Sequence, residues 1–448
     1  MKKSSSVPFL IWVFFLAFRV FGASNGEATR TPLIVDEFNN GSSQRNLIVI
    51  ISDLHMGADL AYAENKENLK PLENFLTKIE ESKNVKELVI AGDLLDEWFV
   101  PASVDTYRGK DQRDFVQRIA ATNRGVIDSL NRIVKEGKIL VTYVPGNHDL
   151  TISEENIELI LPGINQVRDQ ALGLGTYSPK GYPAIAIEYG HRYNYFCAPD
   201  PLSNQDVAPG TILPPGYFFT RIAAQHVVQN CWESDNQVPV INPNADILGN
   251  ESQKSLYAYY RLWENVVDRL FPIENTLDEK FIVTHVNGFT DTYAVLDVLP
   301  FQKNADGPIS VNLYSGAQDT WAERCALNEV AVDIPVMDAI SNAASTEETD
   351  RMAEIQYFKN PESNKKIVVF GHTHEAKLIS SENLNGEKTV YVNSGTWIDH
   401  KDVHANPTTM NFVIITLPES KAVQNAEVVL YNFQDEHPTE MAATSLAL

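Results

Sequence analysis

The stretch LIVIISDLH at residues 47–55 joins an apolar run to two side chains that can bind metal. Continuous aliphatic runs of this length are typical of strands buried on both faces, as in a sheet covered by helices on each side. Asp53 and His55 come directly after the run. Because side chains two residues apart point the same way in an extended chain, we expect the carboxylate and the imidazole to converge at the strand end. Oxygen and nitrogen donors of this kind suit a divalent transition metal.

Three further apolar runs end in the same kind of residue. The groups are Asp93 and Asp96 after Glu87–Ala91, Asn147 and His148 after Ile139–Val144, and His372 and His374 after Lys366–Phe370. Ligand sites in open α/β sheets lie beyond the carboxyl ends of the strands. The sequence therefore predicts that side chains from four separate strands meet at one place.

The order of the remaining elements indicates the fold class. Other apolar runs that we predict to be strands are Ala184–Tyr189, Phe281–Thr284, Thr389–Val392, Phe412–Leu417 and Ala426–Phe433. Helical patterns such as Leu69–Ile79 and Phe115–Val134 separate the earlier runs, and Gly137 is expected to stop the second of them. Strands alternating with helices predict a layered α/β sheet. The last two runs have no helix between them and are expected to form an antiparallel addition.

Composition and charge exclude several classes of protein. The chain has 448 residues, 44% of them hydrophobic and 21% charged, which fits a folded globular protein and excludes a disordered or polytopic membrane protein. The formal net charge is −23. Because such a surface repels phosphate backbones, we expect no nucleic-acid partner.

The first residues have the layout of a secretory signal peptide. A basic start at Lys2 and Lys3 precedes an apolar run from Val7 to Ala23, after which small and polar residues follow. We expect residues 1–23 to be removed on export, so that the protein is secreted or periplasmic with no stable membrane span. The alternative is an uncleaved segment that anchors the chain in the membrane.

We expect the rest of the chain to form one elaborated domain. A polar tail at 24–45 precedes a domain at 46–434, and 435–448 is expected to be a C-terminal tail. Within the domain, about 193–280 is predicted to be a helical cap and about 290–350 a second insertion. The cap helix Gln253–Phe271 has one broad apolar face, which we expect to pack on the core; the alternative is a lid over the substrate. The three cysteines, Cys197, Cys231 and Cys325, are expected to be free thiols or to form one disulfide from the first two.

The ordered motifs resemble those of one superfamily. The series Asp53-x-His55, Gly92-Asp93-x-x-Asp96, Gly146-Asn147-His148-Asp149, a lone His and Gly371-His372-x-His374 resembles the calcineurin-like metallophosphoesterases. That resemblance implies two central mixed β-sheets flanked by helices, here with a helical insertion. The segment Gly92–Trp98 with Gly371–His374 is similar in particular to UDP-2,3-diacylglucosamine hydrolase, which cleaves a pyrophosphate. That enzyme is shorter and cytosolic, so its substrate is not carried over.

The resemblance also implies two divalent metal ions, of which Mn, Fe, Zn and Co all suit the donors. By this resemblance Asp53, His55, Asp93 and His374 hold the first ion, and Asp93, Asn147, His372 and one further His hold the second. Two positions compete for that last ligand. We favour His191, which follows a strand and precedes the large insertion, whereas His285 is the alternative and otherwise lines the substrate pocket.

The implied reaction is hydrolysis of a phosphate ester or pyrophosphate by hydroxide, which bound metals generate at neutral pH. His148 is expected to protonate the leaving group, and Asp96 to orient His148 and raise its pKa. Arg192 and Asn194 are expected to bind phosphate oxygens, with a surface role as the alternative. The expected substrate is a phosphate-containing small molecule or a lipid-linked compound. The alternatives are a nucleotidase or phosphodiesterase of the same superfamily and a binding scaffold without catalysis.

Overall fold

The computed structural model describes residues 36–399, 408–418 and 425–448. The predicted signal peptide at 1–23 and most of the predicted polar tail lie outside these residues. The end of that tail is part of the core, because the ring of Phe38 lies 5.6 Å from that of Phe75 and 5.7 Å from that of Phe412. Among the described residues, no helix has both the length and the apolar character needed to cross a membrane.

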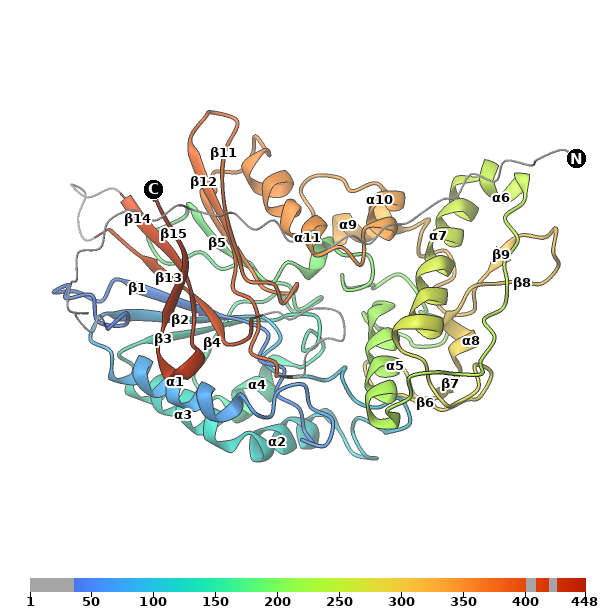
Figure 1. The fold of residues 1–448 in the computed structure, drawn as a ribbon, viewed down its shortest axis with the longest axis horizontal. Coiled ribbons are helices and arrows are strands. Elements are labelled where there is room, and N and C mark those ends of the chain that lie inside the picture. The colour runs from blue at the N-terminus through green and yellow to red at the C-terminus, as the bar shows by residue number, and fades with distance from the viewer. Residues whose placement is uncertain (1–35, 400–407, 419–424) are drawn as a thin grey trace, which may run out of the picture. The chain divides into compact units, whose positions relative to one another are not determined.

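A seven-stranded mixed sheet forms one central layer (Figure 1). Its strands, in spatial order, are β15 (Thr439–Ala447), β14 (Asn425–Asn432), β13 (Asn411–Thr416), β1 (Leu47–Ile51), β2 (Val85–Ala91), β3 (Leu140–Val144) and β4 (Asn165–Gln166). Strands β1 to β4 run parallel, and β13 pairs antiparallel with both β1 and β14. The predicted antiparallel addition is therefore confirmed.

The predicted C-terminal tail at 435–448 is wrong. A short 3₁₀ turn, η4 (Gln434–Glu436), leads into β15, which pairs antiparallel with β14 along its whole length. Most β15 side chains are exposed or half-buried. Its sequence, TEMAATSLA, has no aliphatic run because this edge strand is held by backbone hydrogen bonds to β14 rather than by burial of its side chains.

A second, four-stranded sheet packs against the first. Its strands, in spatial order, are β11 (Lys377–Glu382), β12 (Lys388–Asn393), β10 (Ile367–Phe370) and β5 (Ile185–Ile187). The two sheets bury a shared aliphatic layer that includes Ile50 and Val89 from one and Ile187 and Val369 from the other. Alternate residues of β1, such as Val49, face the opposite layer instead. This double burial explains the unbroken aliphatic runs of the sequence.

Four helices cover the outer face of the large sheet (Figure 1). They are α1 (Leu69–Glu81), α2 (Gln112–Thr122), α3 (Arg124–Glu136) and α4 (Glu154–Ile160). The single helix predicted at Phe115–Val134 is wrong, because α2 and α3 are separated at Asn123, whose side-chain amide donates to the carbonyls of Gly57 and Ile119. Gly137 ends α3 in the left-handed conformation, as predicted.

Between β5 and β10 the chain makes one long excursion. Its elements are η1 (His191–Tyr193), α5 (Gly216–Gln229), α6 (Ala245–Gly249), α7 (Glu251–Asn265), the π-helix η2 (Val266–Leu270), β6 (Ile282–Val283), β7 (Thr292–Tyr293), α8 (Val295–Val298), β8 (Phe301–Gln302), β9 (Ile309–Ser310), α9 (Trp321–Leu327), α10 (Val336–Ser341), α11 (Thr346–Ala353) and the π-helix η3 (Glu354–Phe358). Because β5 pairs directly with β10, the two predicted insertions are parts of this single excursion.

The prediction that the segment Phe281–Thr284 is a strand of a central sheet is wrong. Among the described strands, its strand β6 pairs only with β7, in a separate two-stranded hairpin within the excursion. The aromatic face of α7 packs inside the same excursion: Trp263 is fully buried and stacks on Phe219, with ring centroids 3.9 Å apart. The core-packing role predicted for this face is therefore confirmed. All three cysteines are free.

Candidate metal centre

The segments that follow β1, β2 and β12 are joined by hydrogen bonds just beyond the strands. The amide of Leu54 donates to the carbonyl of Asp93 over 2.9 Å. The amide of Trp397, in the segment that follows β12, donates to the carbonyl of Asp53 over 3.0 Å. The hydroxyls of Ser52 and Ser394 are 2.7 Å apart and join the same two segments. The loops that carry Asp53 and Asp93 are thus fixed to each other, and the first is also fixed to the segment after β12.

The backbone of this region is left-handed at most of the predicted ligands. The φ angles are 55° at Asp53, 44° at His55, 47° at Asp93, 73° at His372 and 59° at His374. We had expected Asp53 and His55 to converge because the chain is extended, and that reason is wrong: tight left-handed turns bring them together. Each such residue costs about 1–2 kcal/mol. Strain of this kind persists where the surroundings fix it, and it concentrates at functional sites.

The residues predicted to hold the first ion lie together. The carboxylate oxygen Oδ1 of Asp53 is 3.1 Å from Nε2 of His374 and 3.9 Å from Nε2 of His55. The same His55 nitrogen lies 3.5 Å from Oδ2 of Asp93. Asp53, His55 and His374 form one of two groups, among the residues that the structure describes, whose ligand atoms all lie close enough to share a metal ion.

The residues predicted for the second ion adjoin the first group. The backbone amide of His148 donates to Oδ1 of Asp93 over 2.8 Å, which places Asn147 beside that carboxylate. The backbone amide of His372 donates to Asp53 over 3.2 Å. The imidazole rings of His372 and His191 have centroids 6.4 Å apart. The structure thus brings Asn147, His191 and His372 to the same strand ends.

Several donors at these strand ends are buried without a hydrogen-bond partner among the described residues. They are Nε2 of His55, Oδ1 of Asn147, and both ring nitrogens of His191. Leaving a buried polar atom unpaired costs about 1–3 kcal/mol, so such atoms call for an explanation. A divalent cation among oxygen and imidazole donors supplies one. The residues present therefore fit the metal ions that the sequence motifs imply.

The pKa values of the groups at the site are shifted in different directions. Burial favours a raised pKa at Asp53, but the charges and hydrogen bonds of His374 and His55 hold the pKa of that carboxyl well below its usual range. Burial, reinforced by Asp149 and Asp53, raises the pKa of Asp93 well above its usual range. Burial also lowers the pKa of His372 to about 3. A neutral imidazole is the form that binds metal.

His148 and Asp96 are held as a pair. Nδ1 of His148 lies 2.9 Å from Oδ1 of Asp96, and the imidazole stacks on the indole of Trp98 with centroids 5.0 Å apart. The orienting contact is therefore as expected. The expected direction of the pKa is wrong: burial lowers the pKa of His148 below its ordinary value, and this exceeds the opposite effect of Asp96.

Comparison with known proteins agrees with this geometry. A sequence model of the family described as calcineurin-like phosphoesterase matches residues 47–376, which is more than half of the chain. The chain belongs to this family. The layered mixed sheets flanked by helices are those that membership predicts. No curated protein matches the phosphoesterase, so the specific likeness to UDP-2,3-diacylglucosamine hydrolase stays a prediction.

Three solved structures show distant likeness to this phosphoesterase. A Vps29 double mutant from Entamoeba histolytica is 10% identical, with 90% of this chain and 99% of that chain covered and a TM-score of 0.27. A nuclease MPE from Pseudomonas putida is 17% identical, with 32% and 53% covered and a TM-score of 0.19. Wild-type Vps29 complexed with zinc, also from Entamoeba histolytica, is 15% identical, with 22% and 47% covered and a TM-score of 0.16. Scores this low carry no inference about fold or site.

Two side chains of the phosphoesterase site, Glu64 and Tyr189, were not predicted from the sequence. The carboxylate of Glu64 lies 3.2 Å from Nδ1 of His55, and burial raises its pKa to about 7. It comes from a loop with no motif around it, so no sequence signal could have selected it. The hydroxyl of Tyr189 donates to Asp53 over 2.5 Å and also contacts Asp93. Its position at the end of a predicted strand was a usable signal, but a tyrosine there is more often a core residue.

The residues predicted to bind substrate have other partners. Arg192 is buried, pairs with Glu188 at 3.2 Å, and donates to backbone carbonyls of Gly175 and Asn328. The side-chain amide of Asn194 donates to the carbonyl of Ala343 over 2.8 Å. Their observed contacts are structural, and a substrate role stays a prediction.

His285, the alternative metal ligand, is half-exposed and follows β6 in the separate hairpin. Its Nδ1 lies 3.1 Å from Oδ1 of Asp105. Within the part of the chain that the structure describes, no contact joins His285 to the residues of the metal centre. Its predicted roles as ligand or pocket residue therefore have no geometric support.

A glycine at the centre can be tested by adding one methyl group. Gly92 has a φ of 104°, and a Cβ there would lie 2.1 Å from Cδ2 of Tyr189. Gly92→Ala is expected to lower the free energy of unfolding by at least about 3 kcal/mol, from backbone strain plus this overlap. Gly181→Ala is the matched control, because its φ is 88° but its Cβ meets nothing within 4 Å.

We expect that control to cost only about 1 kcal/mol, which is the backbone contribution alone. Urea unfolding of both variants measures the difference. Equal losses for the two would contradict the close packing of Tyr189 against Gly92.

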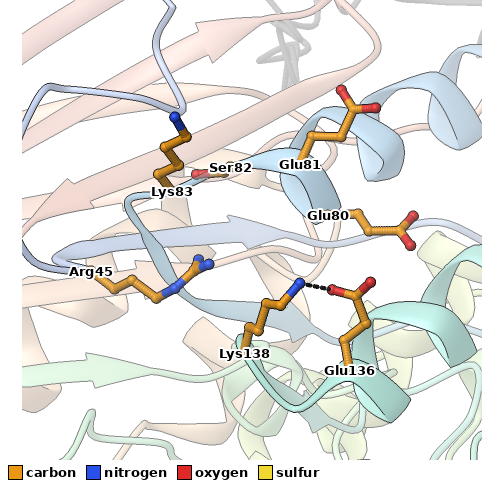
Figure 2. Close-up of a pocket in the computed structure, with 7 residues that line it drawn as sticks. All are labelled: Arg45, Glu80, Glu81, Ser82, Lys83, Glu136 and Lys138. Carbon is orange, nitrogen blue, oxygen red and sulfur yellow. Dashed lines mark hydrogen bonds and ion pairs between the residues drawn. The ribbon is translucent and has the colours of Figure 1, made fainter.

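A surface pocket of about 460 Å³ is lined by none of the predicted metal ligands (Figure 2). Its lining residues are Arg45, Glu80, Glu81, Ser82, Lys83, Glu136 and Lys138. Arg45, Lys83 and Lys138 each lie two residues before a strand of the large sheet, so the pocket is at the amino ends of β1, β2 and β3. Because ligand sites of such sheets lie at the carboxyl ends, this pocket is not the candidate active site.

Proposed function

We propose that this phosphoesterase hydrolyses a phosphate ester or a pyrophosphate bond with the help of two divalent cations. Family membership supports hydrolysis of a phosphoester bond in general. The observation that carries the proposal is the set of unpartnered buried donors, including His55 Nε2 and Asn147 Oδ1, beside the carboxylates of Asp53 and Asp93. A purely structural site would be expected to satisfy these atoms with protein hydrogen bonds.

When bound, the cations supply Lewis-acid polarisation of the phosphoryl oxygens and a source of hydroxide at neutral pH. Asp53, His55, Asp93 and His374 would hold one of them, and Asp93, Asn147, His372 and His191 the other. The side chain of His148 is 13% exposed and has its Nδ1 fixed by Asp96. This leaves Nε2 as the nitrogen that donates a proton to the leaving oxygen.

The burial of two groups supports the proposal of one substrate class over another. A lipid-linked substrate would need an exposed apolar surface, but the aromatic residues Tyr259 and Trp263 of α7 are buried. The carboxylate of Glu97, in the loop that follows Asp93, accepts hydrogen bonds from the side chains of Tyr107 and Gln112. We therefore propose a soluble phosphate compound rather than a lipid. We also propose action outside the cytoplasm, which rests only on the residues 1–23 of the sequence.

Removal of metal gives the direct test. Hydrolysis of a nitrophenyl phosphate by the purified chain is expected to vanish after dialysis against EDTA and to return when Mn²⁺ is added. The reloaded protein is then assayed with a phosphomonoester, a phosphodiester and a pyrophosphate, which assigns the bond class. Activity that survives complete metal removal would contradict the proposal, and a metal-loaded but inactive chain would favour the binding-scaffold alternative.

A further inference from the structure

The imidazole of His148 is held by more than its hydrogen bond. Its Nδ1 lies 2.9 Å from Oδ1 of Asp96, and its ring stacks on the indole of Trp98 with an interplanar angle of 26° and centroids 5.0 Å apart. The ring of His55 packs edge-on against the same imidazole, with centroids 4.6 Å apart. The hydrogen bond fixes one atom of the imidazole, but the plane of the ring can still tilt about that atom. Stacking on a flat indole restricts this tilt, and with it the direction of Nε2.

Trp98 is itself joined to the carboxylate that contacts His148. The backbone amide of Trp98 donates to Oδ1 of Asp96 over 2.9 Å, and this is the oxygen that faces Nδ1 of His148. The amide of Glu97 donates to the carbonyl of His148 over 3.1 Å. The three residues Asp96, Glu97 and Trp98 therefore contact His148 through a carboxylate, a backbone amide and an aromatic ring.

The indole of Trp98 is held by packing rather than by its N–H group. Trp98 is 1% exposed, and its Nε1 has no hydrogen-bond partner among the described residues. A buried indole usually finds a partner for this group. Because no hydrogen bond of its own places the side chain, its flat face against His148 is the contact that a smaller aliphatic residue could not reproduce.

Helix α5 of the excursion also contacts the indole. The ring of Tyr217 packs edge-on against that of Trp98, with centroids 6.1 Å apart. One turn later, Arg221 is fully buried and donates to the hydroxyl of Tyr217 over 2.6 Å. Its guanidinium also donates to the carbonyls of Val100 and Val104, over 2.7 and 2.6 Å, in the loop that follows Trp98. Helix α5 thus holds both the ring of Trp98 and the chain beyond it.

From these contacts we infer that Trp98 is a positioning residue for His148, and that through Trp98 the excursion sets the direction in which His148 donates its proton. This role rests on the proposed function, because it requires that His148 protonates the leaving oxygen. A misplacement of about 1 Å at a reacting group can cost about 10²-fold in rate. A modest tilt of the imidazole is therefore enough to be measured.

Trp98→Leu and Trp98→Phe test the stacking, because neither substitution removes a hydrogen bond of the side chain. Trp98→Leu is expected to lower kcat for an alkyl phosphate by at least about 10-fold, with KM and metal content unchanged. For a nitrophenyl phosphate, whose leaving group needs little help from a proton, the loss should stay below about 3-fold. Trp98→Phe keeps a smaller aromatic face and is expected to lose only about 2- to 5-fold, again for the alkyl phosphate alone.

The orientation of the imidazole gives a readout that does not depend on activity. In crystals of Trp98→Leu, the ring of His148 is expected to tilt out of its plane in the unaltered chain or to take more than one orientation. In crystals of Trp98→Phe, it is expected to keep that plane. An unchanged imidazole in Trp98→Leu would overturn the inference.

Trp263→Leu is the matched control. Trp263 is also fully buried, its Nε1 also has no partner within the described part of the chain, and its ring stacks on Phe219 of the excursion. Its replacement is expected to lower the stability and to leave the ratio of the alkyl to the nitrophenyl rate unchanged. Equal losses on the two substrates in Trp98→Leu, or the same change of ratio in Trp263→Leu, would contradict a positioning role. If Trp98→Leu does not fold, Trp98→Phe decides by the same ratio.

The outcomes also separate a failure of this role from a failure of the proposed function. A chain that hydrolyses neither substrate after loading with Mn²⁺ would refute the function, whereas a displaced imidazole in Trp98→Leu would still support positioning by Trp98. Metal-dependent hydrolysis with one rate ratio in Trp98→Leu, Trp98→Phe and the unaltered chain would do the reverse.

Discussion

Asp93→Asn is expected to reduce the hydrolysis of nitrophenyl phosphate to below about 10⁻⁴ of the unaltered rate. Asp93 is the one carboxylate that our account assigns to both cations, with Oδ2 near His55 and Oδ1 bonded to the amide of His148. Without bound metal, water keeps a pKa near 15.7 instead of about 7, so hydroxide becomes scarce at neutral pH. Steady-state kinetics and elemental analysis of the same sample measure rate and metal content together.

The matched control for this variant is Asp350→Asn. Asp350 is also a buried carboxylate, bonded to Tyr391 and 2.8 Å from the amine of Lys377, but it lies outside the proposed ligand set. Its replacement is expected to change the stability of the protein and to leave the metal content unchanged. If Asp93→Asn retains its metal and its rate, or if the two variants lose metal equally, the assignment of Asp93 is wrong.

His148→Asn is expected to have the second-largest effect. Loss of a general acid typically costs about 10²- to 10⁴-fold in rate, and we expect this loss in kcat for an alkyl phosphate while both metal ions remain bound. The loss should be much smaller for a nitrophenyl phosphate, whose leaving group needs little help from a proton. The measurement is kcat for both substrates in both proteins.

A suitable control is His226→Asn, which alters a buried histidine whose Nδ1 lies 2.7 Å from the carbonyl of Pro272. It is expected to leave both rates unchanged. Equal losses on alkyl and nitrophenyl substrates in His148→Asn would exclude a proton-donor role. Loss of metal from that variant would instead indicate that His148 supports the ligands.

Burial decides which parts of the fold could be predicted. Strands such as β1 and β10 lie between two layers, so they need aliphatic residues at every position, and the sequence shows this directly. Strand β15 is an edge strand held by backbone hydrogen bonds, and most of its side chains are not buried. Its sequence therefore shows no hydrophobic pattern. The segment Phe281–Thr284 has the apolar residues of a sheet strand. A short hairpin can bury such residues as well as a central sheet does, so the residue types could not distinguish the two.

The candidate site was predictable where chemistry restricts the residue type. Asp53, Asp93 and His372 lie at strand ends. Few other residue types could bind a metal ion at these positions, so the motifs around them are informative. Tyr189 was hidden because a tyrosine at a strand end has many structural uses, and only the positions of its neighbours reveal its contacts. The left-handed turns at the ligands were also hidden, since aspartate and histidine carry no sequence signal as clear as that of glycine.

Two cations at the meeting point of β1, β2, β3 and β10 are the central prediction for this phosphoesterase. Diffraction from crystals of the chain grown with Mn²⁺, recorded where manganese scatters anomalously, tests this most directly. We predict two anomalous peaks about 3.5–4 Å apart, both bonded to Asp93. A map with no peak at Asp93, or with peaks only at surface carboxylates, would contradict the account.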